Sequence, residues 1–513
     1  MEARRRPWRS LATALLLPIV AGIFVGSTPR MSVAAESSGP STGAFQVCET
    51  CEFTTIDEAL DAASPGATIE VRGGTYNGPV VIDKPVFLIG FDSPVIDGGN
   101  QGTVVRISAS NVTVQGLTIQ NSGSNFDKED SAVYIEGERV QILDNQLINI
   151  LFGVNAAQSH DLVIARNYIG GMDVDMGIRG DGIKVWYSHR TQILENHING
   201  SRDLLVWYSN DVVVRDNTVE QGRYGFHFMN SDNGVVEHNR LFDNSVGIYL
   251  MYGKSFVIRD NLLQGSRGPS GHGLGLKEID GVEIEGNIIY DNRIGVYIDN
   301  SPLSPVVFNH FRLNLFAYND IGLGLLPSSR NNVFSQNSVI DNQEQVAVLG
   351  SGALGDNQWS ENGVGNFWSD YVGYDADGDG IGDIPFRSEQ LSEELMRSWP
   401  ILQLFRFSVA EAAVDFGSRA VPMFPQDPKF VDMNPLVEPM LQGNAAKPAH
   451  PSNQTTARLW STALLGIVVL AVWWGWRGSR FPASATDAGS SKPLMLKQRF
   501  AGQKAPDGKS GGI

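Results

Sequence analysis

The chain has 513 residues, with 39 basic and 56 acidic side chains and a net charge of −17. Its composition, 42% hydrophobic and 19% charged, is typical of a globular protein and not of a disordered one. The acidic balance opposes binding to phosphate backbones, so no nucleic-acid partner is expected. The 56 glycines indicate many short strands joined by turns.

Residues 1–35 are predicted to be a signal peptide. Four arginines precede an apolar stretch at 11–26, and Val33-Ala34-Ala35 offers a cleavage site before Glu36. The alternative is an uncleaved anchor helix. Either way, the chain that follows is expected to be exported.

Cys48 and Cys51 are the two cysteines of the chain, in C-x-x-C spacing. Outside the cytoplasm a local disulfide is the favoured interpretation. A soft-metal thiolate pair is the alternative.

Residues 36–103 are expected to form an N-terminal cap and the first coils of a repeat fold. Within them, 55–63 predicts a short helix that covers the open end of the stack.

Residues 104–350 repeat one phrase about every 22 residues: alternating apolar side chains, an Asn and, in several copies, a second Asn five residues later. The first asparagines are Asn145, Asn167, Asn196, Asn217, Asn239, Asn261, Asn287, Asn314 and Asn337, and the second are Asn244, Asn292, Asn319 and Asn342.

This period is too short for helical-hairpin repeats, which need about 33 residues or more. It predicts an all-β fold, a right-handed single-stranded parallel β-helix of the pectin-lyase-like type. The asparagines are expected at coil corners, where they adopt left-handed conformations and hydrogen-bond to one another along the stack.

Aligning the coils on the first Asn separates inward from outward positions, because alternate residues of a strand face opposite sides. Two wholly apolar columns are expected inside: Ile183, Leu204, Phe226, Ile248 and Leu274, and Val185, Val206, Phe228, Leu250 and Leu276. Two columns must then point outward: Lys184, Leu205, His227, Tyr249 and Gly275, and Trp186, Trp207, Met229, Met251 and Lys277.

The outward Trp and Met residues are either covered by loops or form a functional surface. Adjacent coils lie about 4.8 Å apart, so Met229 is expected beside Met251, with His227 about 6.5 Å along the strand. One imidazole and two thioethers within reach of one point favour Cu(I) over zinc or calcium. Trp186, Trp207 and Tyr249 could instead form a docking patch for a partner.

An enzyme remains an alternative, because the β-helix also supports polysaccharide lyases and epimerases. The best enzyme-like cluster is Asp173, Asp175, Arg179 and Asp181, which could hold calcium or supply a general base. A solvated insertion loop is the favoured interpretation of this cluster. A metal-free docking scaffold is a third possibility.

Residues 351–440 form a predicted C-terminal extension with an acidic loop. Asp375, Asp377, Asp379 and Asp383 stand at positions 1, 3, 5 and 9 of a calcium loop, and Gly380 stands at its turn. Phe386 replaces the glutamate at position 12, so the loop is incomplete. Structural Ca²⁺ and a solvated acidic turn both fit.

After a linker at 441–458, the apolar run 459–476 is long enough to cross a bilayer. The basic tail at 477–513 would then be cytoplasmic by the positive-inside rule. The expected localisation is therefore the cytoplasmic membrane, with a single C-terminal span and the main domain on the periplasmic side.

Three phrases resemble the NosD family of periplasmic maturation proteins of nitrous oxide reductase. They are Gly225-Phe226-His227-Phe228-Met229-Asn230, Gly247-Ile248-Tyr249-Leu250-Met251-Tyr252 and Gly365-Asn366-Phe367-Trp368-Ser369-Asp370-Tyr371 with the acidic loop after it. The resemblance covers roughly residues 50–440.

The resemblance implies a β-helix without catalysis of its own. Such a protein works with the permease and ATPase subunits of an ABC transporter, a copper chaperone and nitrous oxide reductase, whose copper centres it helps to assemble. The copper role carries over to His227, Met229 and Met251, which would pass Cu(I) on by ligand exchange. The chain lacks a G-x-x-x-x-G-K-[ST] motif, so ATP hydrolysis would belong to the transporter.

Two features depart from the family pattern. Members are usually soluble periplasmic proteins, whereas this chain carries the predicted anchor and tail. The family ending His-Pro-Leu is Asn434-Pro435-Leu436 here, so a role of that histidine does not carry over.

Overall fold

The computed structural model describes residues 44–388, 392, 395, 396, 399–406, 408–420 and 428–440. The chain divides into two compact units, residues 1–440 and 441–513. The predicted signal peptide, linker, span and tail at 1–35, 441–458, 459–476 and 477–513 lie outside the described residues. Those boundaries stay predictions.

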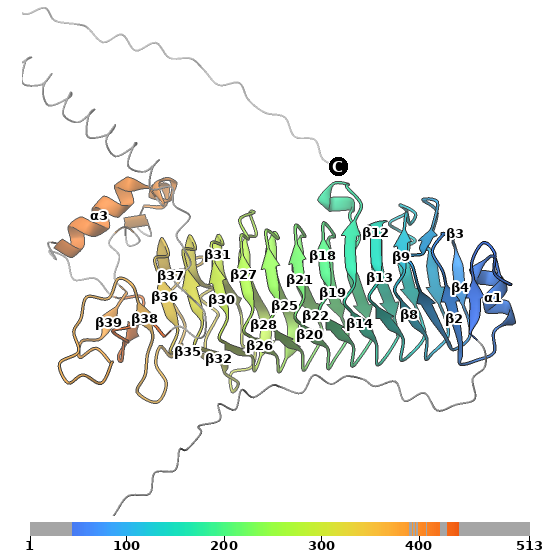
Figure 1. Ribbon diagram of the computed structural model, residues 1–513. Helices are drawn as coiled ribbons and strands as arrows, with labels where there is room; N and C mark the ends of the chain where they lie inside the picture. Colours follow the sequence, from blue (N-terminus) through green and yellow to red (C-terminus); the bar gives the residue numbers. More distant parts are fainter. Residues whose placement is uncertain are drawn as a thin grey trace, which may run out of the picture. The chain divides into compact units, whose positions relative to one another are not determined.

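The described solenoid consists of three parallel sheets, to which successive coils contribute one strand each (Figure 1). Sheet 1 has 13 strands: β1 (Phe45–Val47), β2 (Ala67–Val71), β5 (Val86–Gly90), β8 (Thr113–Gln115), β11 (Gln141–Leu143), β14 (Val163–Ala165), β17 (Gln192–Leu194), β20 (Val213–Arg215), β23 (Val235–Glu237), β26 (Val257–Arg259), β29 (Glu283–Glu285), β32 (Asn309–Arg312) and β35 (Asn332–Ser335).

Sheet 2 also has 13 strands: β3 (Thr75–Asn77), β6 (Val95–Asp97), β9 (Thr118–Gln120), β12 (Gln146–Ile150), β15 (Tyr168–Gly171), β18 (His197–Asn199), β21 (Thr218–Glu220), β24 (Arg240–Phe242), β27 (Leu262–Gln264), β30 (Ile288–Tyr290), β33 (Leu315–Ala317), β36 (Ser338–Ile340) and β38 (Phe367–Trp368).

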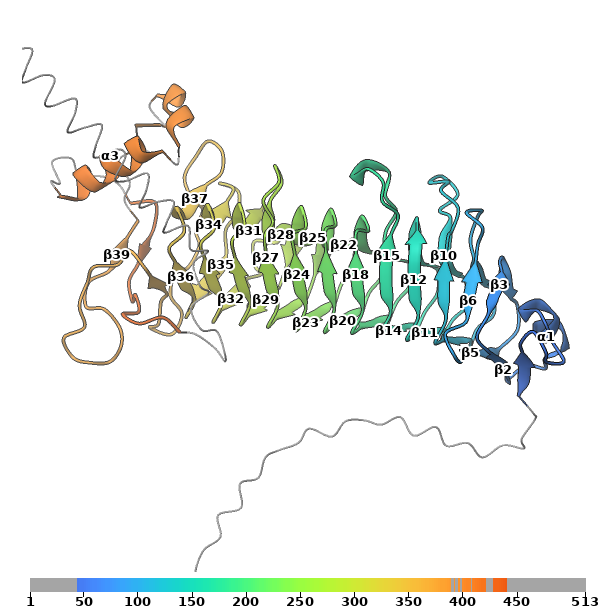
Figure 2. The same cartoon turned by 45° about the horizontal axis from the view of Figure 1, so that its top comes forward.

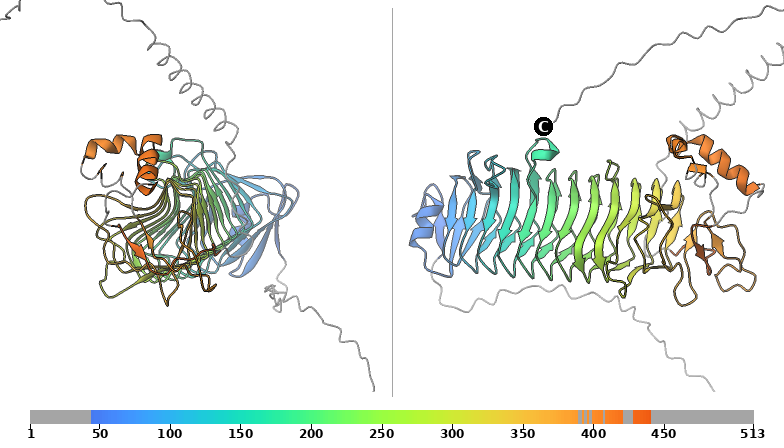
Figure 3. Two further views of the ribbon diagram at one scale, coloured as in Figure 1. Left: turned by 90° about the vertical axis from the view of Figure 1, so that its left-hand side faces the viewer. Right: turned by 180° about the vertical axis from the view of Figure 1, so that it is seen from behind.

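Sheet 3 has 12 strands: β4 (Val80–Ile82), β7 (Val105–Ile107), β10 (Ser131–Ile135), β13 (Phe152–Ala157), β16 (Ile183–Trp186), β19 (Asp203–Trp207), β22 (Tyr224–Met229), β25 (Val246–Lys254), β28 (His272–Asp280), β31 (Ile294–Asp299), β34 (Ile321–Leu325) and β37 (Glu344–Val348). Seen along the stack, the coils superpose (Figure 3, left). The predicted parallel β-helix is confirmed.

Other elements lie at the ends of the solenoid or in insertions. They are α1 (Ile56–Ala62), η1 (Met176–Ile178), η2 (Pro400–Phe405), α3 (Val409–Ala420) and the antiparallel pair β39 (Phe386–Arg387) and β40 (Val431–Asp432). The loop that contains η1 projects from the coils after β15 (Figure 2).

The asparagine ladder is confirmed, with one correction to its backbone. Asn196 Nδ2 donates to Asn217 Oδ1 (3.0 Å), and the same amide-to-amide bond joins successive asparagines from Asn145 to Asn337. The ladder Asn was expected to adopt the left-handed conformation. The left-handed residue at each corner is instead the residue before it, such as Glu195 (φ 54°) or Asp216 (φ 57°). This arrangement lets the ladder side chain turn inward and bond backbone groups of neighbouring coils.

The interior of the solenoid is apolar, as the two inward columns predict. Ile183, Leu204, Phe226, Ile248 and Leu274 all have no exposed surface. The other column is equally buried, with Phe228 the most exposed of its five members at 1%. Burial of these side chains is the main favourable contribution to folding.

The predicted N-terminal helix is confirmed as α1. The Thr55 side chain accepts a hydrogen bond from the Glu58 backbone N–H (3.2 Å), and Glu58 bonds back to the Thr55 N–H (3.2 Å), a capping box. Lys84 Nζ donates to the carbonyl of Leu60 (2.9 Å) near the end of the helix. In the preceding segment, Cys48 and Cys51 are joined by a disulfide bond.

The C-terminal end of the ladder is closed by Asp432, which has no exposed surface. Its carboxylate accepts hydrogen bonds from the Asn366 N–H (2.8 Å), the Trp368 indole N–H (3.0 Å) and the Asn434 N–H (3.1 Å). Burial raises the pKa of Asp432, while these hydrogen bonds oppose the rise. The Asn-Phe-Trp-Ser-Asp-Tyr phrase and the Asn434-Pro435-Leu436 ending are therefore parts of one structural closure.

The predicted localisation, a cytoplasmic-membrane protein with one C-terminal span, is corrected here. Within the part of the chain that the structure describes, no helix combines the length and apolar character needed to cross a bilayer. The longest described helix, α3, has 12 residues, whereas a span needs about 20. The run at 459–476 lies outside the described residues.

Candidate metal centre

The predicted register of the outer face of sheet 3 is confirmed strand by strand. Trp186 pairs with Trp207, Trp207 with Met229, and Met229 with Met251. In the neighbouring column His227 pairs with Tyr249. These side chains belong to β16, β19, β22 and β25, which are consecutive neighbours in sheet 3, so they come from adjacent coils.

Met229 and Met251 are half-buried and point to the same face of neighbouring strands. Adjacent strands are about 4.8 Å apart, so side chains at paired positions on one face are neighbours. Thioethers select Cu(I).

His227 is buried, whereas an exposed position was expected. It is 7% exposed, and the rings of Tyr224 and Tyr249 lie at centroid distances of 4.6 and 6.5 Å from its imidazole. The cause is an irregularity in the β19–β22 pairing: Tyr224 pairs with Asp203 and Phe226 with Leu204, with Gly225 between them.

Only glycine fits at this irregularity, because a Cβ on Gly225 would lie 2.3 Å from a methyl carbon of Leu241 and 2.7 Å from the carbonyl oxygen of Gly247. The expected open surface site is thus a partly enclosed one.

The two ring nitrogens of His227 have different environments. Nδ1 lies 3.2 Å from the carboxylate of Asp203, while Nε2 is buried and has no hydrogen-bond partner among the described residues. A buried polar atom without a partner costs about 1–3 kcal/mol. Its presence beside two thioethers fits a nitrogen that binds a metal ion.

Asp203 belongs to a buried charged network. It accepts hydrogen bonds from Arg223 Nε (3.0 Å) and the Tyr224 N–H (3.3 Å), and it also pairs with Arg223 Nη2. Burial alone would raise the pKa of Asp203, but bonds from His227 and Arg223 hold it below its usual value. On the preceding coil Asp181 pairs with Arg202 (3.0 Å), and burial followed by the charge of Asp203 raises the pKa of Asp181.

His160 and His189 are poorer candidates for metal ligands. Nδ1 of His160 accepts the His189 N–H (3.1 Å), and Nδ1 of His189 accepts the Asn210 N–H (2.9 Å). In a neutral imidazole the other nitrogen then carries the proton and has no lone pair for a metal. Their rings stack at 5.0 Å along a turn, which is a structural role.

His272 lies on the other side of Tyr249 from His227. Its ring stacks on Tyr297 at a centroid distance of 4.4 Å and lies 6.3 Å from that of Tyr249. Burial lowers the pKa of His272 to about 4, with a smaller contribution from Arg293. The sequence pattern did not single out this residue, because its two partners on the neighbouring strands, Val246 and Ile294, are aliphatic.

The aromatic residues predicted as a docking patch fall into two groups. Trp186 and Trp207 extend the methionine column, and each contacts the tyrosine that follows it, Tyr187 (5.0 Å) and Tyr208 (5.6 Å). Tyr187 and Tyr208 stack on each other at 4.8 Å. Tyr249 lies instead beside His227. We call Trp186, Tyr187, Trp207 and Tyr208 the aromatic ledge.

The enzyme-like cluster does not converge on one point. Asp181 is buried and paired with Arg202, whereas Asp173 and Asp175 are exposed. Arg179 donates to the carbonyls of Val174 (2.8 Å) and Gln221 (3.0 Å) and so holds the insertion loop in place. Among the described residues, these groups form no paired carboxylates suited to acid–base chemistry.

Carboxylate oxygens of Asp375, Asp377 and Asp379 lie within 4.8 Å of one another in the acidic loop. The fourth predicted ligand, Asp383, accepts the Ala376 N–H (2.7 Å). Backbone N–H groups of Gly380 and Gly378 lower the pKa of Asp375. Calcium binding by this loop stays a prediction.

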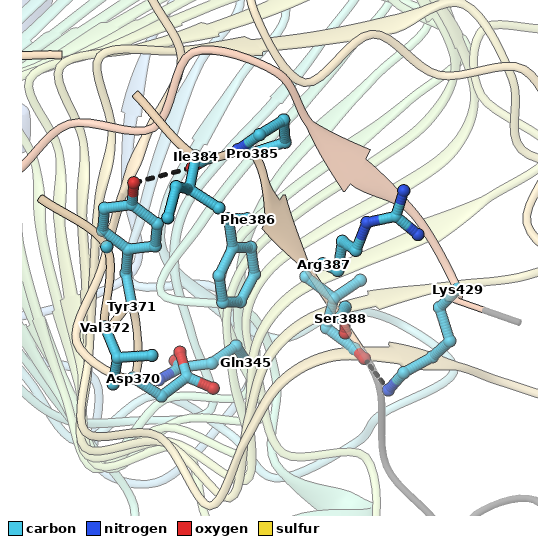
Figure 4. A pocket seen from close by; sticks show the side chains of 12 residues that line it. Gln345, Asp370, Tyr371, Val372, Ile384, Pro385, Phe386, Arg387, Ser388 and Lys429 are labelled. Atoms are coloured by element: carbon cyan, nitrogen blue, oxygen red, sulfur yellow. Dashed lines mark hydrogen bonds between the residues drawn. The ribbon is translucent and has the colours of Figure 1, made fainter. Parts of the chain in front are cut away.

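A cavity of about 230 Å³ lies beside the C-terminal closure (Figure 4). Tyr371, whose hydroxyl donates to the Ile384 carbonyl (2.6 Å), and Phe386 form one wall, and Arg387 and Lys429 lie on the other side. Lys429 donates to Glu344 (3.0 Å) and to the Val346 carbonyl (2.6 Å). The lining of this cavity contains none of the predicted copper ligands.

The fold and this donor set define a class: a parallel β-helix protein with a candidate soft-metal centre on one outer face. Residues 166–373 match the family model described as "Periplasmic copper-binding protein (NosD)". The chain is 30% identical over 382 residues to the "Probable ABC transporter binding protein NosD" of Stutzerimonas stutzeri, covering 71% of this chain and 85% of that protein. It is 28% identical over 394 residues to the protein of the same name in Pseudomonas aeruginosa, covering 72% and 87%. The chain belongs to the NosD family.

Among solved structures, it is similar to the A-module of the mannuronan C-5 epimerase AlgE6 of Azotobacter vinelandii, with a TM-score of 0.45 and 17% identity over 60% of this chain and 93% of that one. It is also similar to the catalytic domain of a GH87 α-1,3-glucanase, with a TM-score of 0.49 and 13% identity over 64% and 70%.

The family description also indicates a location for proteins of this family. It names a periplasmic protein, and both relatives are named as binding proteins.

Proposed function

We propose that this chain handles Cu(I) outside the cytoplasm for the maturation of the copper centres of nitrous oxide reductase. His227, Met229 and Met251 would hold the ion. The observation that carries the proposal is the buried, unpartnered Nε2 of His227 on the same face as two neighbouring thioethers. The family description as a copper-binding protein supports it.

The residues suit an ion that is carried and then released. Two thioethers and one imidazole bind Cu(I) without a negative charge, so the ion can leave by ligand exchange. Tyr224 and Tyr249 shield the imidazole, while half-buried Met229 and Met251 leave one side accessible to an incoming ligand.

The partners follow from the family and from the position of the site. We propose an ABC transporter, consistent with the names of both relatives, together with a copper chaperone and the reductase. The aromatic ledge begins on the strand next to Met229, so a donor that docks on Trp186 and Trp207 would bring its copper close to that thioether. Tyr and Trp side chains suit such interfaces.

The test is an anaerobic Cu(I) titration of the full chain against a competing chelator. We expect one tightly bound ion, and at least a 100-fold weaker affinity in the Met229→Leu/Met251→Leu double variant, which keeps the volume of both side chains. Met433→Leu, at a methionine that is 61% exposed, is the matched control and should bind normally. Equal affinity in the double variant and the wild type would refute this site.

A further inference from the structure

We propose that Asp203 is a positioning residue that fixes the tautomer of His227, so that Nε2 presents its lone pair to the metal. The inference rests on the proposed function, because it concerns the same site. It assigns a task to a buried carboxylate that is not itself a metal ligand.

The hydrogen bond between Asp203 and His227 can run in one direction only. Asp203 has no exposed side-chain surface, and it accepts hydrogen bonds from Arg223 and from the Tyr224 N–H. An ionised carboxylate can accept hydrogen bonds but cannot donate one. The contact of 3.2 Å to His227 therefore requires the proton to be on Nδ1.

The proton on Nδ1 determines the state of the other ring nitrogen, Nε2. A neutral imidazole carries one proton, so protonation at Nδ1 leaves Nε2 with a free lone pair. Nε2 is buried, and the described residues offer it neither a donor nor an acceptor. A Cu(I) ion would supply the missing partner, whereas a proton at Nε2 would be left without one. Carboxylate–histidine–metal triads are a recurrent arrangement in metal sites.

Neighbouring side chains hold both Asp203 and the His227 ring in place. The guanidinium of Arg223 holds Asp203 from one side, and the Tyr224 ring lies 4.6 Å from that of His227. The irregular pairing of β19 and β22 brings Asp203, 24 residues earlier in the chain, to the imidazole. The imidazole plane is thus set before copper arrives.

The experiment compares Asp203→Asn with wild type in the full chain, using two readouts. The first is the ¹⁵N chemical shifts of histidine-labelled, metal-free protein, with the His227 signals identified by their loss in His227→Gln. We expect the Nδ1–H tautomer in wild type. In Asp203→Asn the amide can donate to Nδ1, so the Nε2–H tautomer should appear.

The second readout is Cu(I) affinity, which should fall about 10- to 100-fold in Asp203→Asn. Glu237→Gln is the matched control, because Glu237 is also a buried carboxylate paired with arginines, Arg215 and Arg259, but belongs to sheet 1. It should leave both readouts unchanged. If Asp203→Asn does not fold, Asp203→Ala, which removes the acceptor of the Nδ1 proton, should also let the Nε2–H tautomer appear.

Three outcomes would overturn the inference: an Nε2–H tautomer in the wild type, an unchanged tautomer and affinity in Asp203→Asn, or an equal loss of affinity in Glu237→Gln. The tautomer readout needs no copper. A wild type that binds no Cu(I) but has the Nδ1–H tautomer would therefore refute the proposed function and leave the positioning role of Asp203 intact.

Discussion

In this solenoid, the groups around each histidine ring determine which ring nitrogen carries the proton. At His160 and His189, backbone N–H groups occupy Nδ1 and place the proton on the outer nitrogen. At His227 a carboxylate occupies Nδ1 and leaves Nε2 as a potential ligand. Whether Nδ1 faces a donor or an acceptor from another coil thus decides which ring nitrogen is free to bind a metal.

His272 leads to a prediction about stability and pH. Its pKa is lowered from 6.5 to about 4, first by burial and then by Arg293. As the pH falls below 6.5, the unfolded chain takes up the proton before the folded one does. The stability contributed by neutral His272 is therefore fully present above pH 6.5 and is lost as the pH falls towards 4, by at most about 3 kcal/mol.

His272→Phe removes this titration and keeps a ring against Tyr297. We expect its melting temperature to fall less between pH 7 and pH 5 than that of the wild type. Tyr297→Phe, which keeps His272 and the ring packed against it, is the control and should keep the wild-type profile. Identical profiles for His272→Phe and wild type would rule out a contribution from this residue.

At the scale of single coils, the asparagine ladder makes neighbouring coils depend on each other. Asn217 has no exposed surface. It donates to the Ile193 carbonyl (2.8 Å) and to Asn239 Oδ1 (3.0 Å), and it accepts the backbone N–H of Asn196 (2.9 Å). Removing the amide therefore deprives groups in both the preceding and the following coil of this hydrogen-bond partner.

We predict that Asn217→Ala costs about 3 kcal/mol of unfolding free energy, because buried donors and acceptors cost about 1–3 kcal/mol each when left unpaired. Chemical denaturation checks the value. Asn199→Ala is the comparison, since it removes one partly buried bond to Glu220 (3.1 Å), and it should cost under about 1 kcal/mol. Equal costs for the two variants would contradict a special role of the ladder.

The asparagine ladder and the strand register were predictable because both repeat. Each copy of the repeated sequence motif supports the alignment of the other copies. Met229 beside Met251 follows from spacing alone. The Asp203–His227 contact does not, because it depends on one irregular pair, Asp203 with Tyr224, that breaks the period. The bond from Asn366 to Asp432, 66 residues later, also lies outside any repeat.

The pairing of the two methionines was predictable from the sequence, but the burial of His227 was not. Strand alternation puts His227 on the outer face, but alternation carries no information about which neighbouring rings cover that face. Tyr224 and Tyr249 supply the cover, and Tyr224 reaches it only through the irregularity at Gly225.

For the whole molecule, stability should be directional, because each coil of a solenoid contacts only its neighbours. The two ends of the described stack are closed in different ways. Helix α1, stabilised by its capping box, covers one end, and the buried carboxylate of Asp432 closes the other. Loss of one closure should loosen the coils next to it and leave the distant ones intact.

We predict that Asp432→Ala increases hydrogen exchange in β35, β36 and β38 at least tenfold while leaving β2 and β5 unchanged. The Asn366 N–H and Trp368 indole N–H lose a buried acceptor, and a penalty of about 1.4 kcal/mol in local opening already corresponds to a factor of ten. Thr55→Ala, which removes the capping box, should increase exchange in β2 and β5 and leave β35, β36 and β38 unchanged. Exchange that rises uniformly along the solenoid in either variant would mean that the coils open as one cooperative unit and not from their ends.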